Sequence, residues 1–348
     1  MSAQSSRPTV VGIIANPASG KDIRRLTSRA SVFPNAEKAS MIVRAIAGLE
    51  AAGVRDVLVM PDNGSISGIV FRTLGMSDVP ASLSGGPRFV DMPVSSSAAD
   101  TLLATERMRE AGATALIVLG GDGTHRAVAA RCGKVPLLAL STGTNNAFPE
   151  MREATVAGLA AGLIASGAVP PTAGVRQNKL LRVSCDGRDD IALVDACVTT
   201  NPYVGSRAVW DCAQVDELFV TFAGADGIGL SAIAGQLEPV PREAPYGLHV
   251  RCTLPAQTPR RVLAAIAPGL VAEVGVRDYA RLMPHARTVL TGRSGTIALD
   301  GEREIEFDTA SRIEVSLDPH GPLTIDVAAT LTYAAQHRLL RGYIGDAA

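Results

Sequence analysis

The chain has few features that would tie it to a membrane, to nucleic acid or to an oxidising compartment. Lys and Arg number 33 against 34 Asp and Glu, so the net charge of −1 offers no general attraction to nucleic acid or an anionic membrane. No uninterrupted apolar stretch approaches the roughly 20 residues of a membrane span. Residues 1–8 are polar, without the apolar core of a secretory signal. We therefore expect a soluble, cytoplasmic protein with neither nucleic acid nor membrane as partner.

The chain also has few lysines and no closely spaced pair of cysteines. The five cysteines are scattered and odd in number, without a Cys-x-x-Cys pair, which indicates free thiols in a reducing cytosol. The five histidines are equally dispersed, so a zinc site is not expected. Only Lys21, Lys38, Lys134 and Lys179 among the basic residues are lysines, and the rest are arginines. A lysine inside a glycine loop is therefore more informative than an isolated arginine.

The length and the hydrophobic pattern predict two domains. Apolar residues make up 47% of the 348 residues, which is ample for sizeable cores. The pattern changes near Pro170-Pro171, where the hydrophobic period shortens towards two. We predict a nucleotide-binding α/β domain over residues 1–168, onto which residues 328–348 pack back. A mostly antiparallel, sandwich-like β domain is expected over residues 169–327.

The first half alternates strand and helix patterns. Its strands are predicted from short apolar runs at 10–15, 54–60, 115–119 and 136–140. Its helices are predicted at 36–52 with Asn35 as N-cap, at 98–111 after Ser96 or Ser97, at 125–131, and at 149–165 starting with Pro149. This alternation is typical of a Rossmann-like parallel sheet with right-handed crossovers, in which ligands bind at the carboxyl ends of the strands.

The second half is richer in short strands. Asp186-Gly187 and Asp300-Gly301 indicate hairpin turns. One helix is expected at 259–267, and a final one at 328–340. Further strands are predicted at 179–185, 190–198, 217–222, 246–253, 271–276, 288–291, 295–299, 313–317 and 323–327.

Residues 120–124, Gly-Gly-Asp-Gly-Thr, form a glycine loop between a strand pattern and a helix pattern. Gly120, Gly121 and Gly123 let the backbone turn sharply and approach a ligand, and amide groups ahead of a helix suit phosphate. Asp122 would repel phosphate unless it held Mg²⁺ or took a proton from an attacking hydroxyl. The loop therefore suggests phosphoryl transfer, although plain structural turns with Gly and Asp are common.

Two further polar loops follow predicted strands. The candidate ligand-binding residues of the first are Asn16, Ser19, Gly20 and Lys21, whose ammonium could meet a phosphate. The candidate residues of the third loop are Thr142, Gly143, Thr144, Asn145 and Asn146, which suit ribose hydroxyls or phosphate oxygens. Thr124 of the second loop is a further candidate nucleotide-binding residue. Each loop could be an ordinary strand-ending turn. Because parallel strands end at one edge, we expect all three loops to form one site.

Other signatures do not fit. The dinucleotide fingerprint would need glycine at Arg126, and no Gly-Lys-Ser/Thr follows as in a Walker loop. Ser294 misses the Gly-x-Ser-x-Gly elbow by one residue, so a hydrolase triad has no anchor. His125 could relay a proton, but a solvent-facing side chain is expected.

The three loops, in this order and strand context, resemble those of the NAD kinase/diacylglycerol kinase superfamily. Within it the chain is most similar to the acetoin catabolism protein X family, and the likeness covers the first 170 residues well. The resemblance implies an α/β nucleotide domain, an all-β domain and a last helix that joins the first domain. It also implies ATP and Mg²⁺ as cofactors, NAD as substrate with NADP as product, and homo-oligomers assembled through the β domain. Asp300-Gly301 is similar to a late turn in NAD kinases.

Departures from NAD kinases concern the acceptor. Val194-Asp195 stands where they carry Asn-Glu, and residues 222–226, starting with Phe222 and ending with Asp226, stand where they carry Thr-Pro-Thr-Gly-Ser. Each lost buried hydrogen-bond partner typically costs about 1–3 kcal/mol, so several together could abolish NAD as acceptor. Thr144-Asn145-Asn146 is closer to the lipid-kinase pattern.

The sequence thus favours an ATP-dependent kinase that phosphorylates a hydroxyl of NAD or another small metabolite. Asp122 would act on the hydroxyl or hold Mg²⁺, and Lys21 would neutralise phosphate charge. A nucleotide-binding accessory or sensor without transferase activity is the alternative. A lipid kinase is the second alternative, weakened because no basic amphipathic segment is evident.

Overall fold

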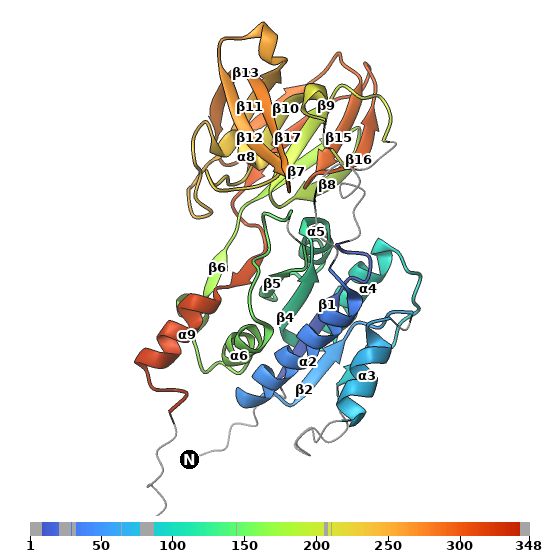
Figure 1. Ribbon diagram of the computed structural model, residues 1–348, viewed down its shortest axis with the longest axis vertical. Helices are drawn as coiled ribbons and strands as arrows, with labels where there is room; N and C mark the ends of the chain where they lie inside the picture. The colour runs from blue at the N-terminus through green and yellow to red at the C-terminus, as the bar shows by residue number, and fades with distance from the viewer. Residues whose placement is uncertain are drawn as a thin grey trace, which may run out of the picture.

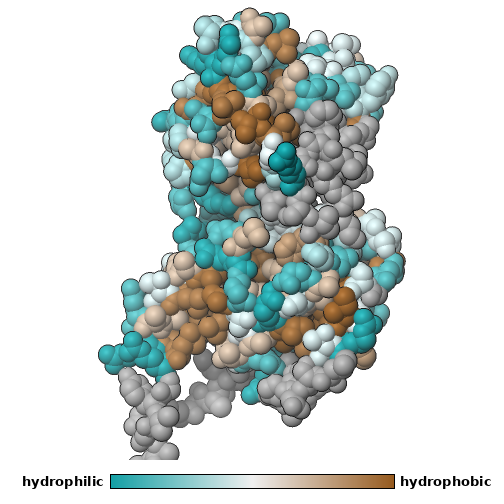
Figure 2. All heavy atoms as spheres, viewed as in Figure 1, coloured by the Kyte–Doolittle hydropathy of each residue, from teal (hydrophilic) through white to brown (hydrophobic). Residues whose placement is uncertain are grey.

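The computed structural model describes residues 9–20, 29, 33–63, 65–76, 87–143, 145–204, 208–209 and 211–341. Two bodies are stacked along the long axis of the molecule, an α/β domain at the bottom of Figure 1 and a β domain at the top. On the face shown in Figure 2, hydrophilic residues gather at the left of the narrow part between them. Among the described residues, no helix combines the length and the apolar character needed to cross a membrane.

A seven-stranded sheet in the order β3-β2-β1-β4-β5-β18-β6 forms the centre of the α/β domain. Its strands are β1 (Val10–Ala15), β2 (Asp56–Val59), β3 (Arg88–Phe89), β4 (Ala113–Gly120), β5 (Leu137–Ser141), β6 (Val175–Gln177) and β18 (Leu323–Ile325). All pairs are parallel except β18 with β6. The predicted parallel sheet is therefore confirmed, and the chain returns to it for its last strand.

Helices cover both faces of this sheet because its buried strands carry apolar side chains on both sides. Ile13 and Ile117 face a core formed with α2 (Asn35–Ala51), α3 (Ser67–Met76), α6 (Ala154–Ala165) and α9 (Val327–Gln336). Ile14 and Val118 face the opposite core, formed with α4 (Ala98–Glu110) and α5 (Asp122–Ala129). The short α7 (Pro171–Gly174) precedes β6.

Helix starts were predicted less well than strands. Ser97 caps α4 as expected, with its side chain accepting from Ala99 N. Asn35 is not a cap, because it is already helical and Pro34 precedes it. Pro149 does not start a helix either. The segment after it runs along β5, with Ser141 N donating to Glu150 O at 2.8 Å, and α6 begins only at Ala154.

The β domain consists of two antiparallel sheets packed face to face. The larger has the order β12-β13-β11-β10-β9-β15-β16 and the smaller β14-β17-β7-β8, and the core between them includes Phe219 and Val315. The strands are β7 (Leu180–Cys185), β8 (Arg188–Ala192), β9 (Asp195–Thr199), β10 (Val215–Val220), β11 (Gly247–Thr253), β12 (Arg261–Ala267), β13 (Leu270–Leu282), β14 (Arg287–Leu290), β15 (Gly295–Leu299), β16 (Glu302–Phe307) and β17 (Ile313–Asp318). One helical turn, α8 (Ser231–Gly235), and two 3-10 turns, η1 (Cys212–Gln214) and η2 (Pro255–Gln257), interrupt them. The expected sandwich is confirmed.

In this domain the sequence pattern predicted the turns and the final helix correctly, but it assigned one strand to a helix. Asp186-Gly187 and Asp300-Gly301 both have positive φ and join β7 to β8 and β15 to β16, as predicted. The helix predicted at 259–267 is wrong. Val262, Ala264 and Ile266 alternate with more exposed neighbours, and the segment is the edge strand β12. The final helix, α9, packs on α6 and α7 of the first domain, as expected.

Helices α2 and α6 cross so closely that glycine is required at the contact. A Cβ atom added to Gly158 would lie 2.1 Å from Ala45 O, and one added to Gly48 would lie 2.2 Å from Thr155 O. Both distances are far inside van der Waals contact, so any side chain there must push the helices apart. The pair fixes α2, which begins shortly after the first polar loop.

We expect Gly158→Ala to lower the free energy of unfolding by about 1–3 kcal/mol, because overpacking a closed contact costs that much. Gly68→Ala in α3 is the matched control. Its added Cβ would meet only Arg72 Nη1, at 3.5 Å, so the better helix propensity of alanine should leave the protein equally or more stable. Urea unfolding of the three proteins measures this. Equal stability of the Gly158→Ala variant and wild type would contradict the close crossing.

Candidate functional site

Three loops at the carboxyl edge of the first sheet are joined by hydrogen bonds. Asn16 follows β1, and its Nδ2 donates to Thr124 Oγ1 of the second loop at 3.0 Å. Ser19 Oγ lies 2.9 Å from Thr142 Oγ1 of the third loop. Thr142 N donates to Gly120 O at 3.2 Å. Loops that are more than 100 residues apart in sequence thus form one continuous surface, as their position after β1, β4 and β5 predicts.

Lys38 holds the first loop in place from the side of α2. Its side chain is fully buried, and its ammonium donates to Asn16 O at 2.9 Å, to Ser19 O at 2.7 Å and to Asn35 Oδ1 at 3.1 Å. A buried ammonium is tolerated only when such acceptors surround it. Gly20, with a φ of 75°, ends the described part of this loop. Lys21 lies outside the described residues, so its predicted contact with phosphate is untested.

The second loop packs so tightly that two of its glycines are required. A Cβ on Gly120 would lie 2.5 Å from Thr124 Cβ, and one on Gly121 would lie 2.9 Å from Asn146 Oδ1. Gly121 is the N-cap of α5, so the first amides of that helix have no intrahelical acceptor. A helix start without bulky side chains suits an anion.

The third loop completes the group with amide side chains. Asn146 Nδ2 donates to Ser141 Oγ at 2.8 Å, and Ser141 Oγ donates to Gly143 O at 2.8 Å. Asn145 is different, because its Oδ1 and Nδ2 are both buried without a hydrogen-bond partner. Unmade hydrogen bonds of this kind are costly in a folded protein and are often completed by a ligand. Thr144 lies outside the described residues.

Asp122 is the first residue of α5, and its carboxylate accepts hydrogen bonds from the backbone of the segment after the third loop. Phe148 N donates to Oδ1 at 2.8 Å, and Ala147 N lies 3.0–3.1 Å from both oxygens. A carboxylate offers about four acceptor positions, so it can accept hydrogen bonds from several groups at once. Asp122 therefore has a structural contact in addition to any chemical role.

Arg242 of the β domain holds the same segment from the other side. Its Nη2 donates to Ala147 O and Phe148 O, both at 2.7 Å. The guanidinium also lies over the rings of Phe148 and Phe222, 5.1 and 4.1 Å from their centroids. Lys179 in turn fixes the segment that carries Arg242. The Lys179 ammonium donates to Ala244 O and Tyr246 O at 2.7 Å, and burial lowers its pKa to about 8.

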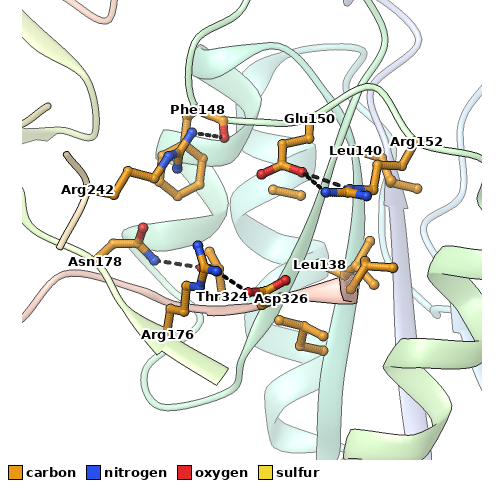
Figure 3. A pocket seen from close by; sticks show the side chains of 13 residues that line it. Leu138, Leu140, Phe148, Glu150, Arg152, Arg176, Asn178, Arg242, Thr324 and Asp326 are labelled. Carbon is orange, nitrogen blue, oxygen red and sulfur yellow. Dashed lines mark hydrogen bonds and ion pairs between the residues drawn. The ribbon is translucent and has the colours of Figure 1, made fainter. Parts of the chain in front are cut away.

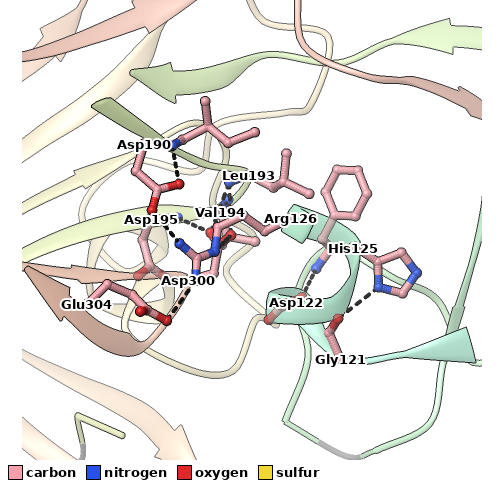
Figure 4. Close-up of polar contacts among 12 residues, drawn as sticks. Gly121, Asp122, His125, Arg126, Asp190, Leu193, Val194, Asp195, Asp300 and Glu304 are labelled. Carbon is pink, nitrogen blue, oxygen red and sulfur yellow. Dashed lines mark hydrogen bonds and ion pairs between the residues drawn. The ribbon is translucent and has the colours of Figure 1, made fainter. Parts of the chain in front are cut away.

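The turn at Asp300 brings a cluster of charges from the β domain to α5. Asp300 is buried and accepts hydrogen bonds from Leu193 N and Val194 N at 3.0 and 2.8 Å. Arg126 of α5 lies among three acids, 2.9 Å from Glu304 Oε1, 3.4 Å from Asp190 Oδ2 and 4.0 Å from Asp300 Oδ2 (Figure 4). Burial, with a smaller effect of the Asp122 charge, raises the pKa of the Asp300 carboxyl to about 7 despite Arg126. The cluster fixes α5 against the second domain.

The expected exposure of His125 is wrong. Its side chain is completely buried, and its Nδ1 lies 2.8 Å from Gly121 O. Because a carbonyl can only accept, Nδ1 carries the proton, and Nε2 is left as a buried acceptor without a hydrogen-bond partner. Burial lowers the pKa of the imidazole to about 4. The histidine therefore supports the second loop in its neutral form.

Several residues of the site were not found from the sequence. Lys38 and Arg242 lie in ordinary helix and loop patterns, and in a chain with so many arginines Arg126 and Arg242 had no distinguishing signal. Glu302 follows the Asp300-Gly301 turn, and its carboxylate lies about 3.5 Å from the position that a Cβ on Gly123 would take. Only the turn itself could have indicated that this part of the β domain meets the glycine loop.

The donor set suits a nucleotide phosphate better than a metal held by protein alone. Among the described residues, no group of three or more His, Cys, Asp and Glu side chains could hold a metal ion. Mg²⁺ is commonly held by one or two carboxylates together with substrate phosphates, and Asp122 offers such a carboxylate. The unpartnered amide of Asn145 offers a donor and an acceptor that a phosphate group could complete.

Comparisons with known proteins follow the same division of the chain. Residues 11–169 match the family model of the ATP-NAD kinase N-terminal domain, and residues 179–320 match that of the acetoin catabolism protein X C-terminal domain. Acetoin catabolism protein X of Cupriavidus necator is 44% identical over 337 residues, which are 95% of this chain and 94% of that protein. Among solved structures, yeast NADH kinase complexed with NADH has a TM-score of 0.54 at 14% identity and covers 99% of this chain and 91% of its own. The latter likeness concerns the fold.

His125 should make the protein sensitive to acid. The pKa of its imidazole is about 4 when folded and about 6.5 when unfolded, so the unfolded chain alone takes up the proton as the pH falls through this window. Stability is present above pH 6.5 and is lost towards pH 4, by up to roughly 3 kcal/mol from this group. Urea unfolding between pH 4 and 7 should therefore show a weaker pH dependence for His125→Gln than for wild type. His320→Gln, an exposed control, should behave as wild type. The same slope for all three proteins would show that His125 does not titrate in this way.

Proposed function

This chain belongs to the acetoin catabolism protein X family within the NAD kinase/diacylglycerol kinase superfamily, and from this premise we propose that it is an ATP-dependent kinase for the hydroxyl group of a small molecule. The observation that carries the proposal is the hydrogen-bonded group of three loops at the sheet edge, with one carboxylate, Asp122, at the start of α5.

In the proposed reaction, the acceptor hydroxyl oxygen forms a bond to the γ-phosphorus of ATP while the bond from that phosphorus to the β–γ bridging oxygen breaks. ADP leaves, and the hydroxyl proton goes to a carboxylate or to water. The amides of residues 120–123 and the Asn145 side chain would bind phosphate oxygens, since positioning and electrostatics dominate this chemistry. Mg²⁺, when bound, would supply charge neutralisation of the phosphates.

Asp122 is the residue on which the reaction would depend. Its carboxylate is already oriented by Ala147 N and Phe148 N, and it would orient or deprotonate the acceptor hydroxyl or hold Mg²⁺. Orientation by two backbone donors reduces the freedom that a catalytic group must otherwise lose on reaching its reactive geometry.

The identity of the acceptor molecule is less well defined by these residues than that of the nucleotide. Val194 is buried and packs with Leu193 and Phe148, and Phe222 packs against Arg242, so an apolar side chain stands at the first position of each departure from NAD kinases. These side chains offer no hydrogen bonds to the riboses or amides of a dinucleotide. We therefore propose a small hydroxyl metabolite as acceptor in preference to NAD, in keeping with the acetoin catabolism in the name of the Cupriavidus relative.

The same two positions favour a second candidate function. A chain that keeps the phosphate-binding loops but carries these apolar side chains at the two positions could be a nucleotide-binding sensor without transferase activity. In that case ATP or NAD would raise the melting temperature, and no phosphorylated product would form with any acceptor.

We expect Asp122→Asn to reduce phosphoryl transfer at least about 100-fold, because proton transfer by a positioned side chain contributes that much or more. ATP consumption and product formation should be measured with NAD and with a panel of small hydroxyl metabolites. Asp91→Asn, which changes an exposed aspartate, is the control and should keep wild-type rates.

Two outcomes would decide between the candidates. Equal rates for Asp122→Asn and wild type would remove Asp122 from the mechanism. Nucleotide-dependent thermal stabilisation of wild type, without product from any acceptor, would replace the kinase by the sensor.

A further inference from the structure

A pocket of about 50 Å³ lies behind the third loop, where β5 and β18 diverge. The two strands are joined only at the pair Leu137 and Thr324, and the segment after the third loop then runs beside β5 in place of β18. Figure 3 shows the side chains that surround the opening, from β5, β6, β18 and the loop that carries Arg242. The polar and charged ones are Glu150, Arg152, Arg176, Asn178, Arg242 and Asp326, with Thr324 beside them.

Most of the charges around this pocket are paired. Arg152 pairs with Glu150 at 2.8 Å, and Arg176 pairs with both Asp326 and Glu243. Arg242 is the remaining cation of the lining, and no described carboxylate lies within ion-pair distance of it. The unpaired positive charge of the pocket is therefore located at Arg242.

Arg242 also has unused donors. Its Nη2 makes both hydrogen bonds to Ala147 O and Phe148 O, whereas its Nε and Nη1 have no hydrogen-bond partner among the described residues. The rings of Phe148 and Phe222 cover the faces of the guanidinium, so water reaches it mainly at its edges. A guanidinium that is partly desolvated and unpaired costs free energy, and an oxyanion recovers that cost because it accepts two parallel N–H bonds.

We propose that this pocket is a binding site for a small oxyanion, a carboxylate or a phosphate, held by the free edge of Arg242. The acids already paired to Arg152 and Arg176 would repel a bulky polyanion, so the site should accept a compact group of low charge.

Binding in this pocket would be felt at the nucleotide loops. Arg242 and Asp122 hold opposite sides of the Ala147-Phe148 segment, so an anion that draws on the guanidinium acts on the segment that orients the carboxylate. A small metabolite bound in the pocket would therefore influence the orientation of the Asp122 carboxylate, although the pocket lies outside the group of three loops. This role does not require the chain to be a kinase, since it depends only on the described contacts.

The test uses the full chain with acetate and inorganic phosphate as separate probes, and sodium chloride of equal ionic strength as blank. We expect a saturable rise in melting temperature with at least one probe, at millimolar concentration. In Arg242→Gln the apparent affinity should fall at least tenfold, and in Arg182→Gln, an exposed arginine of β7 paired with Asp318, it should be unchanged. Preference for acetate or for phosphate identifies which oxyanion the site takes.

Hydrogen exchange of the wild-type protein locates the bound anion without the need for a variant that folds. It also distinguishes binding in this pocket from phosphate binding at the glycine loops. Occupancy of the pocket should slow exchange most in peptides covering residues 145–152 and 240–246, with a smaller effect on residues 120–124. Protection confined to residues 120–124, equal affinities of wild type and Arg242→Gln, or no response to either probe would each overturn the proposal. Because ATP turnover is measured separately, none of these results depends on the kinase reaction.

Discussion

The Ala147-Phe148 segment is held from both sides, and much of the site depends on this arrangement. Its N–H groups are bound by Asp122 from the α/β domain, and its carbonyl groups by Arg242 from the β domain. A short piece of irregular backbone near the domain boundary would otherwise carry unsatisfied polar groups. The same contacts fix a carboxylate at the start of α5 and a guanidinium at the edge of a pocket. One segment thus connects the glycine loops to the second domain.

The fold was predicted from the sequence to the extent that local patterns decide it. The apolar runs of β1, β4 and β5 and the positive-φ turns at Asp186-Gly187 and Asp300-Gly301 were found because each carries its own signal. The segment 259–267 was assigned to a helix because short apolar runs with alanine fit both periods, and only pairing with β13 makes it a strand. Pro149 was predicted to start a helix because proline favours the first helical position. In the structure the segment after it is hydrogen-bonded to β5 instead, and the helix begins later.

The candidate site divides in the same way. The three loops were predicted because glycine, asparagine and hydroxyl residues follow strands whose ends share one edge. Lys38, Arg126 and Arg242 were missed because their roles arise from partners that lie 19, 178 and 95 residues away in the sequence, two of them backbone carbonyls that no sequence pattern shows. His125 was misjudged for a related reason. Its burial follows from the packing of α5 against Phe148, not from any feature of the helix itself.

The lysines of this chain show a further consequence of the way its loops are anchored. Lys38 and Lys179 are both withdrawn from solvent and bound to carbonyl groups, one at the first loop and one beside Arg242, while Lys134 is exposed. Reagents that acylate amines should therefore modify Lys38 and Lys179 only when the native contacts open. The acylation rate of Lys38 would then measure how often the α/β domain opens locally, and that of Lys179 how often the junction between the two domains opens.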